Sequence, residues 1–131
     1  MGSGAQPREN FKKKKMALHY DLPVYKASYD LLLEIFVFTK NFSKEYKYTI
    51  GEKLKNETVE LITCIYRANS TCSKQEKIQK AREHVEVIRL FLRLLKDLHQ
   101  MNIEKFVDIN KKTEDVSKQL AGWQNAMEMK K

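Results

Sequence analysis

The sequence predicts an all-α protein, an up-down-up-down antiparallel four-helix bundle. Its 131 residues suffice for a single ordinary hydrophobic core. Only 4 Gly and 2 Pro, against 32% charged residues, favour helices over a turn-rich β architecture. Four segments carry apolar residues at helical spacing, and the loops between them are only a few residues long, which favours antiparallel neighbours. We therefore expect one bundle domain over 21–131, preceded by a flexible basic tail over 1–20, whose first four residues resemble a cloning remnant.

The first two helices are predicted from their start signals. The first spans about 21–42, because Pro23 suits the first turn of a helix. The second spans about 49–69, because Thr49 is followed three residues later by Glu52. That spacing is the capping-box pattern, in which each side chain bonds the backbone of the other residue.

The last two helices follow in the same way. A second capping-box pattern, Ser73 to Glu76, opens a helix over about 73–100. The last helix spans about 102–127 and has a narrow apolar seam, typical of a helix packed on one side. Gly122 lies in that seam and indicates a close approach of a neighbouring backbone. The seam consists of Phe106, Ile109, Thr113, Val116, Leu120, Trp123 and Met127.

Two of the four helices are more apolar than one bundle requires. At 100° per residue, the apolar residues of 73–100 cover about 220°, and 21–42 is equally broad, whereas a bundle core uses about 100–140°. We expect the surplus to form a homo-oligomer interface, because large exposed apolar patches usually mark contacts. The alternative is a wide core edge covered by neighbouring aromatic residues. The predicted interface residues are Leu31, Ile35, Phe38, Phe42, Val87, Leu90, Phe91 and Leu94.

A line of cations runs along the third helix, opposite its apolar arc, within about 40° on the helical wheel. Two interpretations remain open from the residues alone. The line is a solvated face, partly neutralised by Glu86 and Asp97, or it binds nucleic acid or an acidic protein, since arginine suits phosphate. The predicted binding residues are Arg82, Arg89, Arg93 and Lys96, with Lys53, Lys55 and Arg67 from the second helix.

Composition excludes several classes of function. The formal charge of +8 lies mostly in the termini, since residues 21–129 carry 18 basic and 16 acidic side chains. No apolar run approaches the roughly 20 residues that span a bilayer, and the opening residues lack the apolar segment of a secretory signal. Cys64 and Cys72 form no CxxC pair, and the histidines are scattered. We therefore expect a cytoplasmic, non-enzymatic protein with no catalytic residues, metal, cofactor, membrane or small-molecule substrate.

Three segments carry a family resemblance. "DLPVYKASYDLLLEIFVFTKNF" (21–42), "YTIGEKLKNETVELITCIYRAN" (48–69) and "QLAGWQNA" (119–126) resemble the accessory variability determinant proteins of diversity-generating retroelements. The resemblance implies a barrel-like homopentamer of four-helix protomers, encoded by bacteria, archaea or phages. It also implies that the basic residues of the second and third helices contact a reverse transcriptase, template RNA and complementary DNA. The related rRNA intervening-sequence proteins, general interaction or RNA-binding bundles without a reverse transcriptase, are the alternative.

Overall fold

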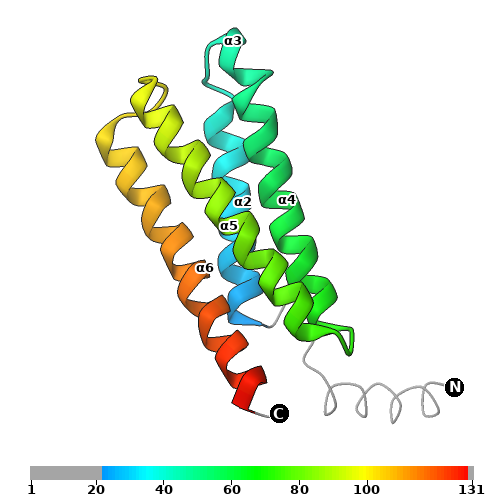
Figure 1. Ribbon diagram of the computed structural model, residues 1–131. Coiled ribbons are helices and arrows are strands. Elements are labelled where there is room, and N and C mark those ends of the chain that lie inside the picture. Colours follow the sequence, from blue (N-terminus) through cyan, green and yellow to red (C-terminus); the bar gives the residue numbers. More distant parts are fainter. Residues whose placement is uncertain (1–21, 130–131) are drawn as a thin grey trace, which may run out of the picture.

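The computed structural model describes residues 22–129, which form an antiparallel helical bundle without strands in this range (Figure 1). The predicted all-α four-helix bundle is therefore confirmed. The predicted tail over 1–20 lies outside the described residues. A short additional helix, α3, interrupts the connection between the first two long helices. The helices are α2 (Pro23–Thr39), α3 (Lys44–Lys47), α4 (Ile50–Asn69), α5 (Lys74–Asp97) and α6 (Ile103–Met129).

Each long helix packs against the next long helix along the chain, and α6 returns to pack against α2 (Figure 1). The order around the bundle is therefore α2, α4, α5, α6, so α2 and α5 face each other across a diagonal. None of the described helices is both long and apolar enough to cross a membrane.

The core is built from the apolar stripes that the sequence predicts. On α6, Ile109, Val116 and Leu120 are fully buried, and Trp123 packs against the core edge, which confirms the narrow seam. Thr113 lies in the same seam and is also fully buried. Its hydroxyl donates to the Ile109 carbonyl at 2.9 Å, which satisfies a polar group that would be costly to bury alone.

The predicted capping boxes are not formed. Neither Thr49 nor Ser73 makes a side-chain hydrogen bond to the helix that follows it. The Thr49 hydroxyl instead donates to the Glu45 carbonyl at 2.7 Å, which ties the start of α4 to α3. The helix with a side-chain cap is α6, where the Asn102 Oδ1 accepts from the Lys105 N–H at 2.8 Å.

The first long helix ends at Thr39, three residues before the predicted end at Phe42. Phe42 leaves the helix but folds back into the core, where its ring meets Phe38 edge to face with the centroids 5.1 Å apart. Gly51 on α4 accommodates this arrangement. A Cβ there would lie 3.1 Å from the Tyr46 carbonyl oxygen and 3.4 Å from the Phe42 ring.

The close approach predicted at Gly122 is wrong. A Cβ at this position would meet nothing within 4 Å, because Gly122 is exposed on the outside of α6. The neighbouring side chain, Trp123, packs against the core, so the apolar pattern beside Gly122 reflects side-chain packing and not contact between backbones.

The end of α5 has a hydrogen-bonding pattern that usually requires glycine. The Gln100 N–H donates to the Leu95 carbonyl at 2.9 Å, and the His99 N–H donates to the Lys96 carbonyl at 3.0 Å. These bonds define a Schellman motif, in which one residue adopts the left-handed conformation. His99 occupies that position with φ 61°, whereas glycine would adopt it without steric cost.

Candidate nucleic-acid interface

Most of the predicted basic line of α5 lies along the seam with α6 and does not form an open solvated face. At its centre, the Arg89 guanidinium donates from Nε and Nη2 to the two carboxylate oxygens of Glu114, at 2.6 and 2.8 Å. Nη2 also donates to Ser117 Oγ at 3.0 Å, and Nη1 contacts Glu86. Most donors of Arg89 are therefore already used within the protomer.

The electrostatics of this contact agree with its geometry. The hydrogen bond from Arg89 is the main cause that lowers the pKa of the Glu114 carboxyl, and the same bond raises the pKa of Arg89. Both shifts favour the charged pair, so Arg89 joins α5 to α6 and is poorly available to an external phosphate.

Two more cations of the line also turn toward α6. Arg82 donates to the Gln124 side-chain oxygen. The Lys96 ammonium lies 4.9 Å from the centroid of the Phe106 ring and 3.8 Å from an Asp97 carboxylate oxygen. Three of the four predicted cations of α5 therefore stabilise the α5–α6 seam.

Of the remaining four predicted cations, three are exposed and one is paired. Arg93 on α5 and Lys53 and Arg67 on α4 are exposed and have no side-chain partner among the described residues. Lys55 pairs with Glu52 at 2.8 Å and lies 5.3 Å from the centroid of the Phe36 ring. Lys53 and Arg67 are about 21 Å apart along α4, so the structure does not gather the seven residues into one compact site.

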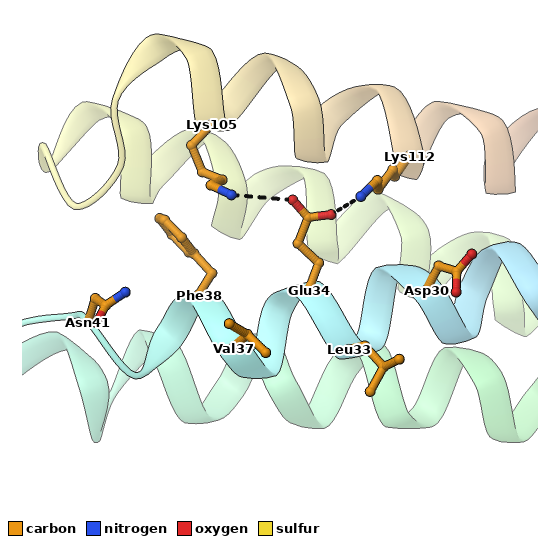
Figure 2. Close-up of a pocket in the computed structure, with 8 residues that line it drawn as sticks. All are labelled: Asp30, Leu33, Glu34, Val37, Phe38, Asn41, Lys105 and Lys112. Carbon is orange, nitrogen blue, oxygen red and sulfur yellow. Dashed lines mark hydrogen bonds and ion pairs between the residues drawn. The ribbon is translucent and has the colours of Figure 1, made fainter.

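A second polar seam, which the helical pattern did not predict, joins α2 to α6. Figure 2 shows Lys105 and Lys112 of α6 reaching the Glu34 carboxylate on α2. The Lys105 distance is 3.6 Å, and the hydrogen bond to Glu34 is the main cause that raises the pKa of Lys112. Glu34 interrupts the apolar stretch LLLEIFVF. A single carboxylate within such a stretch was the sequence signal that could have predicted a paired charge.

These ion pairs border a groove of 580 Å³ with an apolar floor. The central carboxylate of the groove, Glu34, already has two ammonium partners from α6, and a second carboxylate, Asp30, is exposed at its edge. The groove is lined by Asp30, Leu33, Glu34, Val37, Phe38, Asn41, Lys105 and Lys112 (Figure 2).

The structure corrects part of the predicted oligomer interface. Leu31, Ile35 and Phe42 are buried in the core of the protomer, and Phe38, Val87 and Phe91 are half-buried. Their burial within the bundle explains part of the broad apolar arcs. Of the eight predicted residues, Leu90 and Leu94 are exposed.

The exposed apolar residues of α2 are not among the predicted interface residues. Four side chains on the outside of α2 are 41–61% exposed, and we call them the α2 strip: Tyr29, Leu33, Phe36 and Val37. Leu90 and Leu94, which we call the α5 strip, are 62% and 38% exposed on α5. Because α2 and α5 are diagonal in the bundle, the two strips face opposite sides of the protomer.

The titratable groups of the described residues do not assemble into a metal centre. No group of three or more His, Cys, Asp or Glu side chains there is placed to hold an ion. The His84 Nδ1 lies 2.9 Å from the Glu57 carboxylate across the α4–α5 seam. Burial is the main cause that raises the pKa of the Cys64 thiol, which disfavours its nucleophilic thiolate.

Comparison with known proteins adds one positive finding. A family model described as bAvd-like matches residues 23–127, which is nearly the whole described bundle. No curated protein matches the chain.

Proposed function

The chain belongs to the bAvd-like family, and on this basis we propose that it is a non-enzymatic accessory protein of a diversity-generating retroelement. It binds the reverse transcriptase together with template RNA or complementary DNA and supports mutagenic synthesis of complementary DNA. The observation that carries this proposal is the family match over 23–127. The sequence resemblance over 21–42, 48–69 and 119–126 agrees with this match.

The two exposed strips support assembly into a ring. When two different patches of one protein pair head to tail, the copies form either a closed ring or an open filament. We infer that the α2 strip of one protomer packs on the α5 strip of the next, and that five copies close the barrel-like homopentamer implied by the family resemblance. Self-association through one patch paired with itself would not need apolar strips on opposite sides.

Complementary variants test this arrangement. Leu33→Asp disables the α2 strip, and Leu90→Asp disables the α5 strip, so each variant alone should be monomeric in light scattering. An equimolar mixture should form a heterodimer, because one intact α2 strip and one intact α5 strip remain. A mixture that stays monomeric, or wild-type protein that is a monomer, contradicts the head-to-tail interface.

The free cations provide the contact with the reverse transcriptase or with phosphates. Arg93 is the cation of the basic line that has no side-chain partner among the described residues, so Arg93→Glu should weaken association while the bundle stays folded. Lys118→Glu on α6 makes the same charge change at an exposed lysine and serves as the control. Purified reverse transcriptase and template RNA are offered separately to both variants. If the two variants bind equally well, Arg93 has no role in the contact. If the wild-type protein binds neither the reverse transcriptase nor the template RNA, the proposed function is contradicted.

A further inference from the structure

One end of the bundle has a surface that contributes no residue to the contacts proposed above. It lies on the connection between α2 and α4, at the end away from the last residues of α6 (Figure 1). We call it the α3 surface and define it by Lys40, Lys44, Lys47 and Tyr48. Between residues 40 and 51 the chain has three lysines and a single acid, Glu45, so the surface is locally basic.

Three of the four side chains of the α3 surface are open to solvent, and Lys47 is half-buried. Tyr48 is 62% exposed, and Lys40 and Lys44 are exposed without an ion pair among the described residues. The Lys47 ammonium lies 5.8 Å from the centroid of the Tyr48 ring. A planar ring with an adjacent ammonium is therefore presented together on the protein surface.

The backbone beneath this surface is held in place. Phe42 before α3 is buried, and Tyr46 within α3 packs against the core. The Thr49 hydroxyl bonds the Glu45 carbonyl, and the Ser43 N–H donates to the Gln100 side-chain oxygen at 3.3 Å, which joins this connection to the one between α5 and α6. Tyr48 is thus a largely exposed aromatic residue on an anchored turn, which lowers the entropic cost of ordering it on binding.

We propose that the α3 surface binds single-stranded nucleic acid, with a base stacked on Tyr48 and phosphates contacted by the three lysines. Exposed aromatic rings flanked by cations bind single strands in this way, because every base has a π-face. The proposal rests on the nucleic-acid role proposed above and assigns that role to residues outside the α4 and α5 cations. In a ring with cyclic symmetry, every copy presents this end at the same rim, so several surfaces meet one strand.

Fluorescence anisotropy with a labelled oligouridine RNA tests the stacking contact. Tyr48→Ala should weaken binding about 5- to 150-fold, the range expected for loss of one base–aromatic stack. Tyr48→Phe keeps the ring and should bind like the wild-type protein. Because Tyr48 lies largely outside the core, both variants should keep the wild-type melting temperature.

The lysines are tested through the salt dependence of the same measurement. Each phosphate contact to a single strand contributes about 0.7 to the slope of log affinity against log salt. Lys44→Gln combined with Lys47→Gln should therefore lower the slope by about 1.4. The matched pair Lys111→Gln and Lys118→Gln, exposed lysines on α6, should leave the slope nearly unchanged.

The outcomes separate this inference from the proposed function. The proposal for the α3 surface is overturned by any of three results. Tyr48→Ala binds with wild-type affinity, both lysine pairs change the salt slope equally, or the wild-type protein does not bind oligouridine. If the Arg93→Glu variant then still loses the reverse transcriptase, the proposed function stands without it. Loss of oligouridine binding in Tyr48→Ala but not in Tyr48→Phe, with the slope change confined to Lys44 and Lys47, supports it.

Discussion

The contact between Arg89 and Glu114 allows a quantitative test of whether the basic line of α5 is structural. Arg89→Met keeps an unbranched apolar stem of similar reach and removes the guanidinium. Glu114→Gln keeps the shape of the acceptor and removes its charge. The two changes and their combination form a double-mutant cycle, which isolates the energy of the pair from other effects of each substitution.

The expected magnitude follows from the geometry and the exposure of the pair. Hydrogen bonds to charged groups contribute about 1.5–3 kcal/mol when buried, whereas exposed ion pairs contribute about 0.2–1 kcal/mol. The side chains of Arg89 and Glu114 are 28% and 41% exposed, and the contact is bidentate. We therefore expect Arg89→Met to reduce the free energy of unfolding by about 1–2 kcal/mol, with a coupling energy of about 1 kcal/mol.

The coupling energy should depend on pH in a defined direction. The pKa of Glu114 is lowered in the folded protein, chiefly by the hydrogen bond from Arg89. The stabilisation is therefore fully present above the ordinary glutamate pKa of about 4.3 and is lost as the pH falls through the lower pKa of the folded state. Urea unfolding at neutral and acidic pH, at a fixed protomer concentration, measures both effects.

A control cycle uses the exposed pair Glu76 and Lys80, whose charged atoms are 4.0 Å apart. Its coupling should be at most about 0.5 kcal/mol. If the Arg89–Glu114 coupling is no larger than this control at neutral pH, or does not decline in acid, Arg89 does not join the helices as described. It would then be free to serve as a binding residue.

Three further predictions concern the fold and are measured by denaturant unfolding. His99→Gly should stabilise the bundle by about 0.5–1 kcal/mol, because glycine adopts the left-handed conformation at φ 61° without steric cost. Gly51→Ala should cost about 1–3 kcal/mol through overpacking, whereas Gly122→Ala should stabilise by up to ~1 kcal/mol because its Cβ meets nothing. Leu31→Ala should cost about 2–5 kcal/mol, whereas Leu33→Ala, on the exposed side of α2, should change the protomer's stability by no more than about 0.5 kcal/mol.

Helical periodicity was sufficient to predict the bundle and the presence of its four long helices. The predicted second and fourth helices, 49–69 and 102–127, end within two residues of α4 and α6, whereas the predicted first and third helices end three residues beyond Thr39 and Asp97. The short helix α3 was missed because a single turn has too few residues to show a period. The capping boxes failed because a pattern such as Ser73 to Glu76 specifies the side chains and not the backbone angles, which here do not present the Ser73 hydroxyl to the helix.

The candidate site shows a different limit of sequence reasoning. The helical wheel placed Arg82, Arg89, Arg93 and Lys96 on one side of their helix, but an angle on a wheel does not identify the neighbour on that side. The partner came from α6, 25 residues beyond Arg89 in the case of Glu114. A complementary polar stripe, Glu114, Ser117 and Gln124, was the signal that could have predicted the seam.

The circular order of the helices has a consequence for how the chain folds. Contacts between consecutive helices are local in sequence, and domains dominated by such contacts fold within microseconds to milliseconds. The α2–α6 seam, where Glu34 meets Lys112, is different because it joins helices from the two ends of the described chain. Its closure carries the largest loop entropy, so we expect it to form after α4 and α5 have paired. Pulsed hydrogen exchange during refolding should then protect the α4 and α5 amides before those of α2, and simultaneous protection would contradict this order.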